Sequence, residues 1–163
     1  MNPDDTVRPE SDPHGPGVRI HPPFIYAGSI LSGMAIDNYW PQAMPLGIHG
    51  HFYAGIIIVF ALLIAGFSMF EFYRAGTDVR PDKPDSALIN SGPYRFTRNP
   101  LYIVLTLVQI TVAVWFNNAW VLFLVIASVI VITQYAIKRE ERYLEKLFGQ
   151  DYLDYRQRVP RWL

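Results

Sequence analysis

The chain has 163 residues, enough for one domain of ordinary size. Hydrophobic residues make up 51% of it and charged residues only 17%, below the roughly 25% typical of soluble domains. The net charge is zero and there is no cysteine. Overall basicity therefore gives no argument for nucleic-acid binding, and disulfides, thiolate chemistry and cysteine-based zinc sites are excluded.

The N-terminal segment, residues 1–20, is polar and rich in proline and acidic side chains. It lacks the apolar core of a secretory signal, so we expect a disordered polar tail. Residues 21–163 are predicted to form a single membrane domain.

Apolar segments of spanning length follow the tail. Residues 52–70 carry no charge over 19 positions, and residues 101–137 carry none over 37. A spanning helix needs about 20 residues, so the second segment is long enough for two helices. A weaker apolar segment, 22–40, is predicted to be a first span or a re-entrant segment.

The long segment has a turn signal near its middle. Asn117 and Asn118 stand there between Trp115 and Trp120. We predict a helical hairpin made of residues 101–116 and 119–137 with a very tight turn. The fold class is therefore all-α, a polytopic transmembrane bundle of about four spans.

The basic residues predict the orientation. All 14 Lys and Arg residues precede the first segment, lie in the loop 71–99, or follow residue 137. Four spans place these three groups on one side of the membrane, which the positive-inside rule assigns to the cytoplasm. Both termini, the loop 71–99 and the tail 138–163 are thus expected in the cytoplasm.

Polar side chains interrupt the last two spans. Asn99, Tyr102, Thr106 and Gln109 share one face of the third helix, beginning at its cytoplasmic end. Gln134 and Glu141 share a face of the fourth. These stripes indicate either hydrogen bonds between helices or the lining of a cavity.

The fourth helix is predicted to continue as an amphipathic C-terminal helix to about Phe148. On it, Glu141 interrupts an apolar face formed by Ile137, Leu144 and Phe148. An unpaired buried carboxylate is costly, so a cationic partner is expected. The alternatives are an ion pair with a nearby arginine (Arg95, Arg98 or Arg161) and a ligand that carries ammonium or hydroxyl groups.

The four histidines do not indicate a metal site. His14 lies in the tail, His21 is isolated, and His49 and His51 lie in the outer connection.

Two sequence blocks carry a resemblance to a known family. The first is Ser91-Gly-Pro-Tyr-Arg-Phe-Thr-Arg-Asn-Pro-Leu-Tyr102, and the second begins at Glu140-Glu141 and continues through Leu144, Phe148, Gly149, Tyr152, Tyr155 and Val159. Separated by a helical hairpin, they resemble the signature of the isoprenylcysteine carboxyl methyltransferases and their bacterial and phospholipid N-methyltransferase relatives. The resemblance covers about residues 66–163.

The resemblance implies an integral membrane enzyme that transfers a methyl group from S-adenosylmethionine. It implies a cofactor at the cytoplasmic membrane face, bound by Tyr94, Arg95, Arg98, Asn99, Pro100, Tyr102, Glu140 and Glu141. Arg98 suits the cofactor carboxylate and Glu140 or Glu141 its ammonium or ribose hydroxyls, while Tyr94 or Tyr102 suits the adenine or the sulfonium. Arg98 and Glu141 are the candidate catalytic residues, and no metal is implied.

The sequence departs from the family pattern at two positions. Asn99 stands where many relatives have histidine, and Val104 where glycine is common. Asparagine cannot act as a general base, so any proton transfer must fall to another group, for which Glu141 is the nearest candidate.

The expected partners are membrane lipids and a lipidic or prenylated acceptor, in a bacterial inner membrane and without nucleic acid. The acceptor is left open among a carboxylate, an amine and a thiol. Two alternatives are a membrane reductase of related fold that uses NADPH and a non-enzymatic membrane scaffold.

Overall fold

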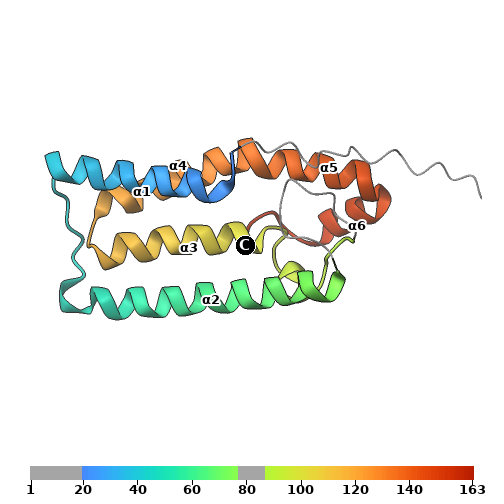
Figure 1. Cartoon of the computed structure of the whole chain (residues 1–163), viewed down its shortest axis with the longest axis horizontal. Helices are drawn as coiled ribbons and strands as arrows, with labels where there is room; N and C mark the ends of the chain where they lie inside the picture. Colours follow the sequence, from blue (N-terminus) through green and yellow to red (C-terminus); the bar gives the residue numbers. More distant parts are fainter. Residues whose placement is uncertain (1–19, 77–86) are drawn as a thin grey trace, which may run out of the picture.

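A computed structural model describes residues 20–76 and 87–163, and within these ranges every regular element is helical (Figure 1). The predicted tail before Ile20 and the part of the loop between Gly76 and Ala87 lie outside the described residues. The elements in chain order are α1 (Pro22–Tyr39), η1 (Gly47–His49), α2 (Gly50–Ala75), η2 (Gly92–Arg95), α3 (Pro100–Trp115), α4 (Ala119–Ile132), η3 (Thr133–Ile137), α5 (Lys138–Phe148) and α6 (Gln150–Arg158).

Two of the helical rods are long and apolar enough to cross a membrane. One runs from Gly47 to Ala75 through η1 and α2, and the other from Ala119 to Phe148 through α4, η3 and α5. α3 is apolar but shorter, with 16 residues, and α1 has 18. The predicted helices are therefore present, and two of them meet the length and composition of a span.

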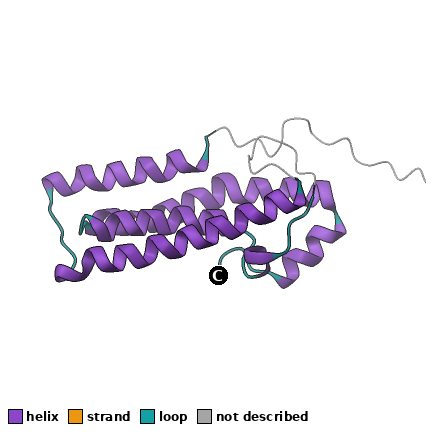
Figure 2. Cartoon of the chain, turned by 60° about the horizontal axis from the view of Figure 1, so that its bottom comes forward, coloured by secondary structure: helices purple, strands orange, loops and turns teal. Residues whose placement is uncertain are grey.

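α3 lies at the centre of the bundle. It packs against α2 on one side and against α4 on the other, while α1 covers α4 (Figures 1 and 2). Ala54 and Ala61 of α2 are fully buried. Gly33 of α1 allows a close approach to α4, since an added Cβ would lie 2.7 Å from a methyl group of Val121.

The hairpin between α3 and α4 turns where the sequence predicted. Asn117 adopts a φ of 50°, a left-handed conformation that asparagine tolerates better than most residues. Asn118 then caps α4, because its side-chain oxygen accepts a hydrogen bond from the backbone N–H of Val121 at 3.0 Å. The two asparagines thus end one helix and start the next within three residues.

The rod that begins with α4 continues into α5 as predicted, but it passes through one π-helical turn, η3. Ser128, Ile132 and Ala136 are buried at steps of four, and Ile137 and Glu141 are buried at a step of four that begins at the last residue of the turn. The second series is therefore shifted by one residue from the first. The wider turn accommodates that extra residue and keeps both buried series toward the bundle.

The chain then folds back on itself. The rod ends at Gly149, whose φ is 54°, and α6 leads the last residues to the beginning of α3. There the backbone N–H of Arg98 donates to the carbonyl of Pro160 at 2.9 Å. The sequence predicted one amphipathic helix in this tail. The structure has two helices, followed by a non-helical C-terminal strap, residues 159–163, that returns to the beginning of α3.

Candidate functional site

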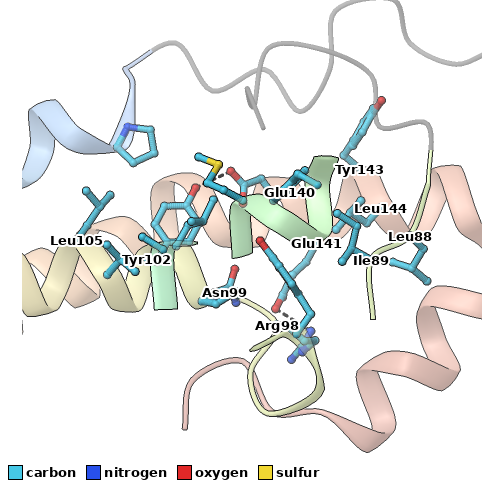
Figure 3. A pocket seen from close by; sticks show the side chains of 18 of the residues that line it. Leu88, Ile89, Arg98, Asn99, Tyr102, Leu105, Glu140, Glu141, Tyr143 and Leu144 are labelled. Carbon is cyan, nitrogen blue, oxygen red and sulfur yellow. Dashed lines mark hydrogen bonds and ion pairs between the residues drawn. The ribbon is translucent and has the colours of Figure 1, made fainter. Parts of the chain in front are cut away.

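A cavity of about 630 Å³ opens at the end of the bundle where α3 begins (Figure 3). Its wall combines the beginning of α1, the second half of α2, the segment 87–99, the first turns of α3, and α5 with α6. The lining residues are His21, Pro22, Pro23, Ala65, Met69, Phe72, Ala87, Leu88, Ile89, Tyr94, Arg98, Asn99, Pro100, Leu101, Tyr102, Val104, Leu105, Glu140, Glu141, Tyr143, Leu144, Tyr152 and Tyr155.

The segment before α3 is fixed from two sides. On the α2 side, the Ser91 hydroxyl donates to the buried carboxylate of Glu71, and Gly92 packs so closely that an added Cβ would lie 2.9 Å from that side chain. On the α6 side, the Tyr155 hydroxyl donates to the carbonyl of Tyr94 at 2.8 Å. These contacts hold the wall of the cavity between two helices that are distant in sequence.

Asn99 and Thr97 attach the C-terminal strap to the start of α3. The Thr97 hydroxyl and the Asn99 side-chain amide donate to the carbonyl of Arg161 at 3.1 and 2.9 Å. Pro100 follows as the first residue of α3, where its missing N–H costs nothing. The strap is thereby held where the Arg161 side chain reaches the cavity floor.

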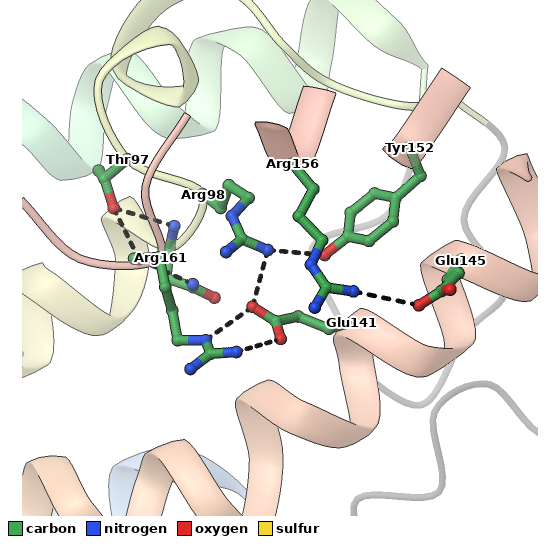
Figure 4. A network of polar contacts seen from close by, with 8 residues as sticks. Thr97, Arg98, Glu141, Glu145, Tyr152, Arg156 and Arg161 are labelled. Carbon is green, nitrogen blue, oxygen red and sulfur yellow. Dashed lines mark hydrogen bonds and ion pairs between the residues drawn. The ribbon is translucent and has the colours of Figure 1, made fainter. Parts of the chain in front are cut away.

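Arg98 and Glu141 line that floor and form an ion triad with Arg161 (Figure 4). The Arg98 guanidinium donates to Glu141 Oε1 at 2.8 Å, and Arg161 binds both carboxylate oxygens, at 2.8 and 2.6 Å. The side chains of Arg98 and Glu141 are each 9% exposed, and that of Arg161 is 30% exposed. The predicted ion pair of Glu141 is therefore present, with two of the three arginines that the sequence offered.

The triad determines the protonation state of Glu141. This residue lies in α5, one turn beyond the apolar part of the helical rod. Burial alone would raise the pKa of this carboxyl, but the hydrogen bond from Arg161 and the positive charges of Arg98 and Arg161 outweigh it and hold the pKa below its ordinary value. The same hydrogen bond raises the pKa of Arg161. Glu141 is consequently ionised at neutral pH, and both of its oxygens already accept hydrogen bonds.

The neighbouring carboxylate has a different partner. Glu140 Oε1 accepts a hydrogen bond from the buried Tyr102 hydroxyl at 2.5 Å. The two adjacent glutamates therefore have different partners. Glu141 binds the two arginines of the triad, and Glu140 binds the Tyr102 hydroxyl.

The sequence left two alternatives for the polar residues of α3, the lining of a cavity and hydrogen bonds between helices, and the structure shows both. Asn99 and Tyr102 line the cavity. Deeper in the bundle, Thr106 shares a 2.9 Å hydrogen bond with the Tyr26 hydroxyl, and Gln109 donates to Ser29 at 3.0 Å and to a backbone carbonyl of α4. The first two residues of the stripe therefore line a cavity, and the last two bind other helices.

Aromatic side chains close the end of the cavity that α6 covers. Burial raises the pKa of both Tyr152 and Tyr155, so their hydroxyls stay protonated. The Tyr152 hydroxyl accepts a hydrogen bond from Arg98 at 3.3 Å, and the ring of Tyr94 packs edge-to-face on Phe72, with centroids 5.9 Å apart. The wall is flat and apolar here, with polar groups at its margin.

The structure brings together seven of the eight predicted cofactor residues: Tyr94, Arg98, Asn99, Pro100, Tyr102, Glu140 and Glu141. Arg95 is exposed and does not line the cavity.

Three groups of lining residues were missed. The α2 residues Ala65, Met69 and Phe72 recur at helical spacing, a signal available in the sequence, whereas nothing local indicated that His21 would line the same cavity. Tyr152 and Tyr155 belong to the second sequence block, but no role was assigned to them.

The polar groups fit a ligand that carries both charges. Arg98 lines the cavity with a guanidinium group whose Nε has no hydrogen-bond partner among the described residues, and its positive charge suits an anionic group of a ligand. Glu140 offers carboxylate oxygens to a cation or a hydroxyl. The volume lies within the range of small-molecule and cofactor sites, about 300–1,000 Å³. The residues therefore fit an amino-acid-containing cofactor such as S-adenosylmethionine.

Comparison with known proteins agrees with this geometry. The sequence matches the model of the phospholipid methyltransferase family over residues 49–151, which include α2, α3 and the paired glutamates. An uncharacterized protein of Haemophilus influenzae is 41% identical over 63 residues, which are 39% of this chain and 100% of that protein. No solved structure matches the chain. The match over residues 49–151 confirms the resemblance, and the chain belongs to the phospholipid methyltransferase family.

Proposed function

We propose that this protein is an integral membrane enzyme that transfers a methyl group from S-adenosylmethionine to a lipidic, amphiphilic acceptor at the cytoplasmic membrane face. The observation that carries the proposal is the cavity itself. It brings a buried arginine, Arg98, together with the adjacent carboxylates Glu140 and Glu141, inside the region that matches the family.

The proposed topology has four spans, α1, α2, α3 and the α4–η3 part of the last rod, in a single domain with both termini in the cytoplasm of a bacterial inner membrane. α1 and α3 lie alongside the two long apolar rods, which supports their crossing the same membrane. α3 is about 24 Å long at 1.5 Å per residue, short of a core of about 30 Å. The N-terminal end of α3 would therefore lie within the membrane, beside the cavity, and the cofactor would enter the cavity from the cytoplasm.

Each lining residue has a proposed task toward the cofactor. Arg98 would bind its carboxylate, and Glu140 would accept from its ammonium or ribose hydroxyls. Tyr94 or Tyr102 would contact the adenine or the sulfonium. Glu141 would act as a positioning residue, because its two oxygens hold Arg98 and Arg161 in place.

The protein's contribution to the reaction is alignment and exclusion of water. When bound, the cofactor supplies an electrophilic methyl group. The apolar part of the wall, formed by Pro22 and Pro23 of α1, Met69 of α2 and Leu105 of α3, would receive the hydrocarbon part of the acceptor. A polar floor beside an apolar side wall suits a pair of substrates of which one is water-soluble and one is a lipid.

The test is calorimetric titration of the detergent-purified protein with S-adenosylhomocysteine and, separately, with NADPH. We expect saturable binding of the first ligand that is lost in Arg98→Ala and Glu141→Ala. Glu145→Ala, which removes an exposed carboxylate one turn along α5, is the matched control and should bind as the wild type does.

Binding of NADPH alone would favour the membrane reductase. Binding of neither ligand by a monodisperse sample would favour the scaffold. Either result would reject the methyltransferase proposal. Saturable binding of S-adenosylhomocysteine justifies assays of methyl transfer to lipid acceptors with an amine, a carboxylate or a thiol.

A further inference from the structure

Transfer of a methyl group to an amine acceptor requires a proton acceptor, and neither Glu141 nor Asn99 is suited to be one. A protonated amine has no lone pair for the attack, so it must first lose a proton. Both oxygens of Glu141 accept from guanidinium groups, and Asn99 is an amide whose nitrogen donates to the carbonyl of Arg161. This inference rests on the proposed function and concerns the same cavity.

His21 is the imidazole in the cavity wall, among the residues that the structure describes. It precedes α1, outside residues 49–151 that match the family. Although His21 occupies the N-cap position, its side chain makes no capping hydrogen bond. Imidazole is the side chain whose titration falls closest to neutral pH, which suits proton transfer under physiological conditions.

The backbone fixes His21 at the mouth of the cavity. Immediately before it, the N–H of Ile20 donates to the Tyr135 hydroxyl of η3 at 2.9 Å. Immediately after it, Pro22 is buried and, with Pro23, begins α1 with a restricted φ. The exposed imidazole is therefore held at the boundary between the apolar wall and solvent, where the headgroup of a lipid would lie.

Charged and titratable groups surround this position. Across the cavity α5 contributes Glu140 and Glu141, α3 contributes Tyr102, and the segment before α3 contributes Arg98. Behind His21, the Arg139 guanidinium lies over the ring of Tyr135, 4.8 Å from its centroid. Among these groups, Glu141 pairs with Arg98, and Glu140 accepts a hydrogen bond from Tyr102.

We propose that His21 is a catalytic residue that removes the proton from the amine headgroup of a lipidic acceptor. The N–H bond of the ammonium breaks, and its proton moves to a ring nitrogen of His21. The freed lone pair forms the N–C bond to the methyl group as the C–S bond breaks and its electron pair stays on sulfur. The proton then leaves His21 to solvent, to which the side chain is exposed.

The experiment compares wild type, His21→Ala, His21→Gln and a matched control, His49→Ala, which alters a histidine at the opposite end of α2. Methyl transfer from labelled S-adenosylmethionine to phosphatidylethanolamine is measured in mixed micelles. The pH is varied from about 5.5 to 9 in steps of ~0.5 pH unit, with and without added imidazole. Affinity for S-adenosylhomocysteine is measured in parallel by calorimetry.

We expect both His21 variants to lose about 10²–10⁴-fold in kcat, the range for loss of a general base, with unchanged affinity for S-adenosylhomocysteine. The fall of the wild-type rate toward acidic pH should disappear, and imidazole should restore part of the rate in His21→Ala but not in wild type. A structural role would not give rescue by imidazole.

Three outcomes would overturn the assignment. The first is an unchanged pH–rate profile in His21→Ala, and the second is a loss of rate accompanied by loss of cofactor binding and no rescue. The third is a wild-type protein that binds S-adenosylhomocysteine but methylates only carboxylate or thiol lipids, which would leave the proposed function standing. Absence of binding in the wild type would instead reject the proposed function itself.

Discussion

The two ends of the bundle are held together by different chemistry. At the cavity end, Arg98, Glu141 and Arg161 bind one another through charged side chains. At the opposite end, polar side chains bind the backbone instead: the Asn117 side chain accepts from the N–H of Met44 at 2.9 Å, and Trp120 Nε1 donates to the carbonyl of Trp40 at 2.6 Å.

This difference between the two ends distinguishes contacts that folding requires from contacts that folding does not require. The bonds at the far end satisfy backbone groups at helix ends, as any tight turn must. A buried ion triad costs desolvation that an apolar cluster would not, and within the described residues it leaves Arg98 Nε without a partner. Folding requirements explain the far end, whereas the charged groups at the cavity end agree with the ligand site proposed above.

The largest expected effect comes from breaking the triad. Glu141→Ala leaves two guanidinium groups without their carboxylate, of which Arg98 is buried, and should lower the free energy of unfolding by about 3 kcal/mol. Unfolding in mixed detergent micelles measures this change. The partial exposure of Arg161 keeps the loss below the upper end of the range for buried pairs.

Glu145→Ala is the matched control for that change. Its pair with Arg156 spans 3.3 Å between side chains that are 43% and 44% exposed, so its loss should cost less than about 1 kcal/mol. Equal losses in the two variants would contradict the contrast between a buried triad and a surface pair.

The second prediction concerns pH. Because the folded-state pKa of Glu141 is below its unfolded value, the stability it contributes is complete above the unfolded pKa, about 4.3, and is lost as the pH falls through the folded value. The difference in unfolding free energy between wild type and Glu141→Gln should thus stay constant from pH 7 to about 5 and shrink below about 4. A difference that grows on acidification would reverse the assigned sign.

Sequence alone predicted much of this end of the molecule. The charge-free runs indicated the apolar helices, and the step 137, 141, 144, 148 placed Glu141 on a buried face. The arginine partners were confined to three candidates, of which Arg98 and Arg161 proved correct. Arg161 became a partner only because the tail reverses at Gly149, a tertiary feature that helical periodicity does not report.

Two further features depend on tertiary structure. The π-helical turn of η3 adds one residue between two buried faces that are each regular, so no local pattern reveals it. His21 joins the cavity through the contact between Ile20 and Tyr135, which lie 115 residues apart. Contacts between residues so far apart in the sequence are determined by tertiary packing. The sequence therefore predicted the part of the site formed by the two sequence blocks, but not the part formed by His21.

The third prediction tests the packing that holds the far half together. Gly33→Ala would place a Cβ 2.7–2.8 Å from side-chain and backbone atoms of Val121 and should destabilise the α1–α4 contact by about 1–3 kcal/mol. Gly28→Ala, where nothing lies within 4 Å, should be neutral or stabilising. Both variants should bind S-adenosylhomocysteine below their unfolding temperatures, since neither residue lines the cavity.

The smallest effect is expected at the hairpin turn. Asn118→Ala removes the cap from Val121 N–H and should lower the free energy of unfolding by about 1 kcal/mol, while Asn118→Ser retains a capping oxygen and should recover most of the loss. Cofactor affinity should not change in either variant, because this turn lies at the end of α3 opposite the cavity. A cap variant that weakened cofactor binding in the folded protein would show that the two ends are coupled, and the division between a folding end and a ligand end would then fail.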